Sequence, residues 1–205
     1  MRQNEYISRV LDEELVALLR GVPAIALEGP KGVGKTESAA RLAATVRRLD
    51  VPAERSVVAA DPALALDGPR PVLIDEWQRL PPVWDAVKRA VDDGAGPGSF
   101  LLTGSATPGE SPTHSGAGRI VSLRMRPLSF FERNREQATV SLATLLAGRR
   151  PAVDGTSGVG LRDYVDEILR SGFPGLRGLE GRALRAQLDG YLARIVDADL
   201  EEMGL

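Results

Sequence analysis

The chain has 205 residues, of which 43% are hydrophobic, and a net charge of −2. A chain of this size can bury one hydrophobic core, or one core and the start of a second. Zero cysteines exclude disulfides and thiolate metal sites, and a single histidine, His114, leaves no imidazole cluster for zinc, so any metal must be held by oxygen.

The N-terminal region predicts a helix from about Glu5 to Leu19 and then a buried strand over 22–28. The helix carries acidic residues, which the early region of a signal peptide would not. No apolar run approaches the ~20 residues that span a bilayer. We therefore expect no membrane association and a cytoplasmic location.

The segment that follows this strand is GPKGVGKT, from Gly29 to Thr36, and it satisfies the phosphate-loop pattern G-x-x-x-x-G-K-[ST]. Glycines let the backbone N–H groups point inward, and the start of a predicted helix over 35–49 adds positive potential. Lys35 is expected to reach the terminal phosphates of ATP, and Thr36 to offer its hydroxyl to Mg²⁺. The predicted nucleotide-binding residues are Gly29, Pro30, Lys31, Gly32, Val33, Gly34, Lys35, Thr36 and Glu37.

The use of lysine supports this interpretation. Only three of the 26 basic residues are lysines, and two of them, Lys31 and Lys35, lie in this loop, where a planar guanidinium would be too wide. A glycine-rich turn that binds nothing is the alternative, and we give it little weight.

Two adjacent carboxylates, Asp75 and Glu76, end a predicted strand over 71–75 that follows a short predicted strand over 56–60. Like charges are costly at the end of a buried strand unless a cation lies opposite them. We predict that Asp75 helps to hold Mg²⁺ opposite Thr36, and that Glu76 orients and partly deprotonates the attacking water. A pair of acids that merely ends a strand at the surface is the weaker alternative.

The next elements are a helix over about 82–92 and strands over 99–103 and 119–125. Strands that alternate with helices predict an α/β fold, with a parallel sheet covered by helices on both faces. Ligands of such sheets bind beyond the carboxyl ends of the strands. Thr103 or Ser105 is therefore a candidate to contact the water or the γ-phosphate, although a polar turn residue is an equal alternative.

Residues 119–150 contain seven arginines and two acids, a net charge of +5, which suggests either a solvated surface or a face for phosphates, nucleic acid or an acidic partner. Arg119 is the last residue of a predicted mobile loop over 104–119. We expect it near the ligand-binding edge of the sheet, and we expect it to act on ATP bound by a neighbouring subunit, with a generic surface arginine as the alternative. His114 in the loop is more simply a solvated residue than a catalytic one.

Several motifs together resemble the prokaryotic AAA-like P-loop ATPases that join an N-terminal ATPase domain to a C-terminal domain of uncharacterised function. The motifs are LEGPKGVGKTESA, DP at 61–62, LIDEWQ, VWD at 83–85, LLTGSATP, HSGAGR, MRPLSFFE and SGFPG at 171–175. The resemblance implies that Gly29 to Thr36 bind ATP, that Asp75 and Glu76 form the magnesium and water site, and that Thr103 or Ser105 is the sensor. It also implies an extra strand between those that carry the phosphate loop and Asp75.

This resemblance divides the chain into an ATPase domain over 1–150 and, over 151–205, a linker with the start of a mainly helical C-terminal domain. Members of the family are about twice as long, so we expect a fragment or a short form. Four apolar residues of a predicted helix from about Gly181 onward would then lack part of their partner surface: Leu184, Leu188, Leu192 and Ile195.

The expected function is Mg²⁺-dependent ATP hydrolysis that drives a conformational change acting on a protein or nucleic-acid partner, with a homo-oligomer as a candidate assembly. A switch or adaptor that binds ATP and hydrolyses it slowly is the main alternative. A P-loop kinase is less favoured, because a kinase does not need the water-positioning Glu76 directly after the magnesium aspartate.

Overall fold

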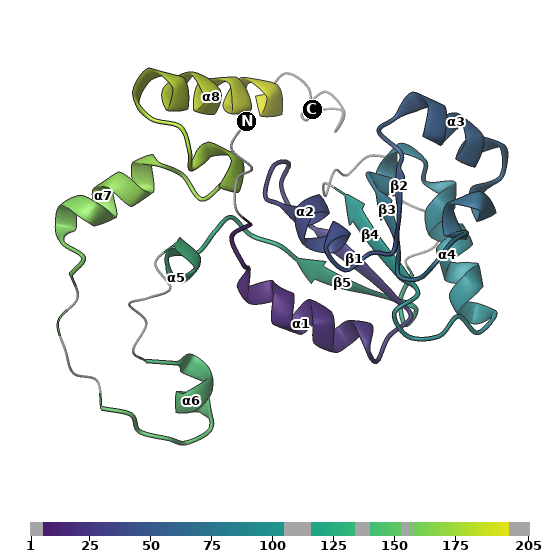
Figure 1. The fold of residues 1–205 in the computed structure, drawn as a ribbon, viewed down its shortest axis with the longest axis horizontal. Coiled ribbons are helices and arrows are strands. Elements are labelled where there is room, and N and C mark those ends of the chain that lie inside the picture. The colour runs from purple at the N-terminus through teal and green to yellow at the C-terminus, as the bar shows by residue number, and fades with distance from the viewer. Residues whose placement is uncertain (1–5, 105–115, 134–139, 153–155, 157, 197–205) are drawn as a thin grey trace.

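The computed structural model describes residues 6–104, 116–133, 140–152, 156 and 158–196. Within them, five parallel strands form one sheet in the order β2-β3-β4-β1-β5 (Figure 1). The strands are β1 (Ala24–Glu28), β2 (Thr45–Arg48), β3 (Val72–Asp75), β4 (Phe100–Gly104) and β5 (Ile120–Arg124). The predicted parallel α/β fold is confirmed. So is the strand expected between those that carry the phosphate loop and Asp75, because β4 lies between β1 and β3.

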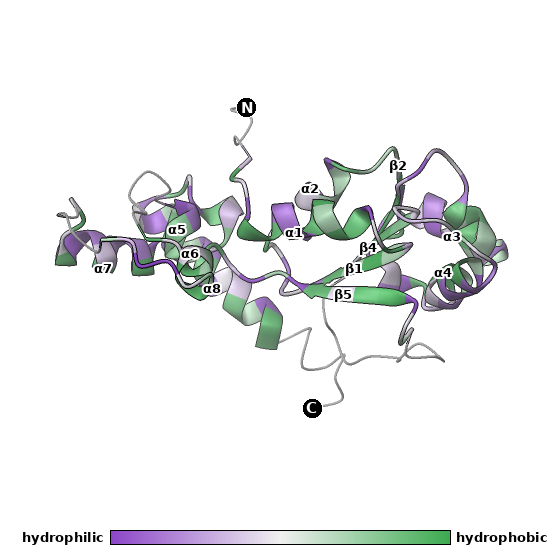
Figure 2. Ribbon diagram, turned by 90° about the horizontal axis from the view of Figure 1, so that it is seen from below, coloured by the Kyte–Doolittle hydropathy of each residue, from purple (hydrophilic) through white to green (hydrophobic). Residues whose placement is uncertain are grey.

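Helices cover both faces of the sheet, because successive residues of a strand point to opposite sides. In β1, Ala24 and Ala26 pack into a cluster with α3 (Pro52–Ala60), the 3₁₀ turn Pro62–Leu66 and α4 (Pro82–Asp92). Ile25 and Leu27 pack on the other face against α1 (Val10–Leu19) and α2 (Lys35–Ala40). Both clusters exclude water almost completely, and in Figure 2 the strands of the sheet are largely coloured as hydrophobic.

Six predicted elements are found with small changes at their ends. The helix over 82–92 has the predicted bounds, with Pro82 in its first turn, where a missing N–H costs nothing. The strands β1, β3, β4 and β5 differ from the predicted ranges by at most two residues at either end. The last described helix, α8 (Gly181–Arg194), begins where it was expected.

The predicted helix over 35–49 is wrong in its second half. Helix α2 ends at Ala40, and the chain turns into β2, which pairs with β3. The amides of Ala44 and Thr45 both donate to the carbonyl of Pro71, which begins this pairing. The β-branched pair Thr45 and Val46 suits a strand, and tertiary pairing outweighed the helical pattern of the preceding alanines.

The predicted strand over 56–60 is also wrong, because these residues form the second half of α3. Pro52 in the first turn is a helix-start signal that was overlooked. Val58 is buried and its neighbour Val57 is 60% exposed, so the two valines lie on different sides of one helix.

The first helix begins at Val10, later than the predicted Glu5, because Arg9 forms its N-cap. The carboxylate of Asp12 accepts the backbone N–H of Arg9 at 2.7 Å. Tyr6, Ile7 and Ser8 precede the helix without regular secondary structure, and Glu5 lies outside the described residues.

After β5, the chain forms short helices that extend away from the sheet, with α8 returning toward the phosphate loop (Figure 1). They are α5 (Phe130–Arg133), α6 (Leu142–Leu146), α7 (Leu161–Leu169), the 3₁₀ turn Pro174–Leu176 and α8. Of the four apolar residues singled out in the last helix, Leu184 is buried, whereas Leu192 is 60% exposed. The predicted domain boundary near residue 150 stays a prediction. None of the helices in the described part of the chain has the length and apolar character that a bilayer crossing needs.

Candidate functional site

The phosphate-loop sequence lies between the end of β1 and the start of α2, at the carboxyl edge of the sheet. Gly29, Gly32 and Gly34 have φ values of 150°, 75° and 104°, which side chains other than glycine rarely adopt. These angles let the chain wrap around a small volume just before the N-terminus of α2. This is the loop, strand and helix arrangement that the motif requires for binding phosphate.

A second constraint requires glycine at position 29, because the backbone there closely approaches Met125, just after β5. The amide of Met125 donates to the carbonyl of Glu28 at 2.7 Å, so the chain beyond β5 continues beside the loop. A Cβ atom at Gly29 would collide with the carbonyl oxygen of Met125. Only glycine fits here without a shift of the backbone.

The Lys35 side chain lies underneath the loop and is 5% exposed. Its Nζ donates to the carbonyls of Gly29 at 2.8 Å and Pro30 at 3.0 Å. Burial lowers the pKa of Lys35, and the negative charges of Glu76 and Asp75 oppose that shift without cancelling it. The loop therefore holds a compact ammonium group beside the two carboxylates.

Asp75, the last residue of β3, accepts hydrogen bonds from α2, the helix that follows the phosphate loop, and from the neighbouring strand β4. Its Oδ1 accepts the hydroxyl of Thr36 at 2.8 Å and the hydroxyl of Thr103 on β4 at 2.5 Å. The predicted convergence of Thr36, Asp75 and Thr103 is therefore found. A hydroxyl and a carboxylate are ligands that Mg²⁺ accepts, so these side chains fit the ion that accompanies ATP. Ser105, the alternative to Thr103, lies outside the described residues, as does His114.

Glu76 adopts a left-handed backbone, with φ 55° and ψ 44°, a conformation that costs a non-glycine residue about 1–2 kcal/mol. The turn separates its side chain from that of Asp75. Gln78 Nε2 donates to Glu76 Oε2 at 2.6 Å. The charge of this carboxylate nevertheless opposes the lowering of the Lys35 pKa by burial, so Glu76 belongs to the same group of charges. Gln78 was not among the predicted site residues.

Arg119 does not lie where it was predicted. It precedes β5, whose first residue Ile120 pairs with Ala24, the first residue of β1, so it lies at the amino edge of the sheet. The phosphate loop follows the other end of β1. The Arg119 Nε donates to Asp92 Oδ1 at 2.8 Å in an exposed ion pair, and this hydrogen bond lowers the pKa of Asp92. The expectation failed because a residue before a parallel strand lies opposite the ligand-binding edge.

The +5 stretch is also partly neutralised within the chain. Besides the pair of Arg119 with Asp92, Arg133 donates to Glu167 on α7 at 3.3 Å and to the carbonyl of Leu128. Arg124 and Arg126 remain exposed. The simple interpretation of this stretch as a continuous phosphate-binding face therefore finds only partial support.

Residues outside the predicted set also hold the phosphate loop. The buried Arg9 donates to the carbonyl of Val33 in the loop at 2.8 Å and forms an ion pair with Glu132 at 3.1 Å. From the other side, the Tyr191 hydroxyl of α8 donates to the carbonyl of Lys31 at 3.3 Å. The sequence offered one signal for the ion pair of Arg9 with Glu132, because Glu132 ends the motif MRPLSFFE. Nothing in the sequence connected this glutamate to Arg9.

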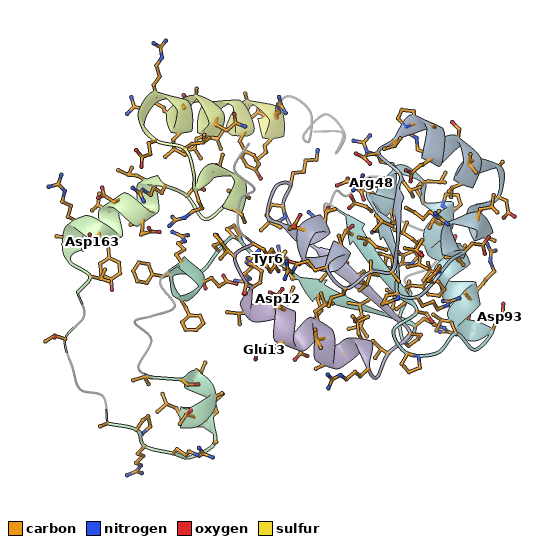
Figure 3. The ribbon with its side chains drawn as sticks, viewed as in Figure 1. Tyr6, Asp12, Glu13, Arg48, Asp93 and Asp163 are labelled. Carbon is orange, nitrogen blue, oxygen red and sulfur yellow. The ribbon has the colours of Figure 1, made fainter. Side chains whose placement is uncertain are left out.

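Tyr6 ties the N-terminal segment to the helix that follows the loop. Its hydroxyl bonds the carboxylate of Asp12 at 2.7 Å and the hydroxyl of Ser38 in α2 at 2.8 Å, and Figure 3 shows Tyr6 beside Asp12 at the start of α1. The Arg41 guanidinium lies 4.2 Å from the centre of the Tyr6 ring. Burial raises the pKa of Tyr6 to about 12, so the hydroxyl stays protonated.

Comparison with protein families agrees with this geometry. A family model described as an AAA domain matches residues 22–134, more than half of the chain. The chain belongs to the AAA domain family. The match begins before β1 and ends just after α5, so it contains the phosphate loop, Asp75, Glu76 and Thr103. Membership of this family supports nucleotide binding.

Two curated relatives match most of the chain. The uncharacterized proteins Mb2031c of Mycobacterium bovis and Rv2008c of Mycobacterium tuberculosis are each 29% identical to it over 198 residues. The alignment covers 91% of this chain but 38% of each relative, so the AAA domain protein described here spans well under half their length. Comparison with solved structures finds no significant match.

The loop geometry predicts unequal effects of alanine at two of its glycines. Gly29→Ala should lower the free energy of unfolding by about 2–4 kcal/mol, because the new Cβ meets the Met125 carbonyl in addition to the backbone strain. Gly32→Ala, where nothing lies within 4 Å of the added atom, should cost only about 1 kcal/mol. Urea denaturation of both variants measures this difference, and equal losses would contradict the close approach at Gly29.

Proposed function

We propose that this AAA domain protein binds ATP with Mg²⁺ and hydrolyses it. The observation that carries the proposal is the convergence of Thr36, Asp75 and Thr103, with Lys35 beneath the loop and Glu76 next to Asp75. Each group suits one requirement of phosphoryl transfer, which depends on positioning and electrostatic stabilisation far more than on covalent chemistry by the protein.

In the proposed mechanism, inward-facing backbone N–H groups of the loop hold the phosphates, and Lys35 turns from the carbonyls of Gly29 and Pro30 to the terminal phosphates. Thr36 and Asp75 would hold Mg²⁺, and the bound ion would supply positive charge that neutralises the phosphate oxygens. Glu76 orients a water in line with the γ-phosphate and accepts its proton. Thr103, at the end of β4, contacts the water or the γ-phosphate.

One observation favours the slower alternative, a nucleotide-dependent switch. Gln78 donates to Glu76 Oε2 at 2.6 Å, and this hydrogen bond restricts how the Glu76 carboxylate can turn. A protein in which this bond keeps Glu76 from reaching the water would bind ATP and signal through changes in the loop with little turnover. A P-loop kinase remains the less favoured function, for the reason that Glu76 directly follows Asp75.

We also propose how ATP hydrolysis at this site acts on the rest of the protein and on its partners. Hydrolysis is proposed to drive a conformational change that acts on a protein or nucleic-acid partner, within a homo-oligomer in the cytoplasm. The exposed position of Arg119, away from the phosphate loop of its own chain, is compatible with action on a neighbouring subunit.

Lys35→Ala should abolish detectable ATP binding, because it removes the buried cation beneath the loop. Titration calorimetry with ATP and Mg²⁺ measures the affinity. Lys88→Ala on α4 is a matched control, since it removes another of the three lysines away from the loop and should leave the affinity unchanged. Unchanged affinity in Lys35→Ala would refute the proposed phosphate site.

Glu76→Gln should keep ATP bound but reduce phosphate release by about 10²–10⁴-fold, because an amide cannot take the proton of the water. Asp75→Asn should instead weaken the Mg²⁺-dependent part of ATP binding. Steady-state phosphate release and calorimetry at several Mg²⁺ concentrations separate the two effects. Identical behaviour of the two variants would show that the carboxylates do not have separate roles.

Arg119→Ala should retain ATP affinity and lose turnover if Arg119 acts on a neighbouring subunit, where an arginine supplied from outside is worth about 10³–10⁵ in rate. Mixing this variant with Glu76→Gln should restore part of the activity, because mixed interfaces pair an intact glutamate with an intact arginine. Phosphate release is measured in mixtures shown by sedimentation to co-assemble. No recovery in those mixtures rejects the role in trans.

A further inference from the structure

We propose that Arg9 is a positioning residue for the phosphate loop, and that Glu132 holds Arg9 in place. This inference rests on the proposed ATP binding and adds two residues to its machinery, neither of which touches the nucleotide. Arg9 precedes the first helix and Glu132 lies in α5, so both are far in sequence from the loop over 29–36.

The Arg9 guanidinium uses all three of its nitrogens in a buried position. Nη1 donates to the carbonyl of Val33 at 2.8 Å, Nη2 donates to the carbonyl of Arg126 at 2.6 Å, and Nε donates to Glu132 Oε1 at 3.1 Å. Arg9 is only 5% exposed to solvent. These three bonds connect the phosphate loop to the chain that follows β5 and to α5.

The bond to Val33 determines which way one peptide group of the loop faces. A trans peptide is planar, and its C=O and N–H point in opposite directions. Because Arg9 holds the Val33 carbonyl, the N–H of the same peptide, which belongs to Gly34, points away from Arg9, and we infer that it faces the inner side of the loop. That side is where the loop motif binds phosphate. Gly34 has φ 104°, a conformation that glycine adopts readily because it has no β-carbon.

Glu132 fixes Arg9 through a set of bonds that leaves little freedom. Its carboxylate accepts the backbone N–H of Val10 at 2.8 Å and the N–H and hydroxyl of Ser129 at 2.6 Å and 2.9 Å, besides Arg9 Nε. Burial acts to raise the pKa of Glu132, but these hydrogen bonds and the charge of Arg9 together lower it, so the group is ionised at neutral pH.

A buried ion pair of this kind is weak evidence for stability, because desolvation offsets much of the attraction between the charges. It does define a geometry. An arginine presents several N–H donors in a rigid plane, and here that plane meets two carbonyls and one carboxylate at once. A lysine offers one nitrogen on a flexible stem and cannot hold the three acceptors in the same arrangement.

The test uses Arg9→Lys, which keeps the charge, and Arg9→Met, which removes it, in the full chain. Both variants should bind ATP about tenfold more weakly than wild type in titration calorimetry, as expected for the loss of one well-aligned loop N–H. Hydrogen exchange should become faster in the peptide that contains 29–36 and stay unchanged in the peptide that contains β4.

Arg133→Met is the matched control. Arg133 is also a partly buried arginine beside Glu132, but it pairs with Glu167 and the Leu128 carbonyl, and within the described residues none of its hydrogen bonds reaches the loop. It should lower the thermal midpoint and leave ATP affinity within twofold of wild type. An equal loss of affinity in Arg133→Met would show that general destabilisation explains the result, and would overturn the proposal.

A double variant, Arg9→Met with Glu132→Gln, keeps the test decisive if Arg9→Met alone fails to fold, because it leaves no buried charge without a partner. Its thermal midpoint should exceed that of Arg9→Met, while its ATP affinity should remain about tenfold below wild type. Recovery of wild-type affinity would overturn the positioning role. If wild type itself binds no ATP, the proposed function fails, whereas wild-type binding with unchanged affinity in Arg9→Lys rejects only the role of Arg9.

Discussion

The shared acceptor Asp75 Oδ1 is the interaction around which the site is organised. It takes one hydrogen bond from Thr36, the second residue of α2, and one from Thr103 on β4. The bond from Thr103 requires β4 to lie directly beside β3, and the strand order provides this. The bond from Thr36 requires α2 to begin within reach of the end of β3, so Asp75 makes both bonds only when the sheet order and the start of α2 are both correct. The order of the strands is as much a part of the site as the motif.

Local patterns in the sequence predicted the centre of the site well. The glycine spacing from Gly29 to Thr36 and the acids after a buried strand each carry their own physical requirement, and the structure brings them together with Thr103. The predictions failed where a tertiary partner decided the outcome. Alanines before Thr45 favour a helix, yet pairing with β3 makes a strand, and the valines of α3 resemble a strand unless Pro52 is taken as a helix start.

Arg119 and Arg9 show that the position of a single charged side chain was also hard to predict from the sequence. The position of an arginine side chain depends on the acceptor that it contacts in the folded protein. The sequence alone does not show that Arg119 lies near Asp92 or that Arg9 lies near Glu132. Arg119 was assigned to the wrong edge of the sheet, and Arg9 was treated as part of an amphipathic helix. The motif MRPLSFFE contributed to the family resemblance, but the role of its glutamate became visible only when the carbonyl of Val33 and the guanidinium were seen together.

The contacts that hold the phosphate loop have a consequence for the order in which the chain folds. They join residues that are 117, 123 and 160 positions apart, through Arg9 with Arg126, Arg9 with Glu132 and Lys31 with Tyr191. Contacts that close such long stretches of chain form late, because the entropy of closure is lost before any bond repays it. On a ribosome, α8 leaves after the central sheet, since synthesis begins at the N-terminus. The central sheet can thus assemble while the nucleotide loop still lacks its contact with Tyr191.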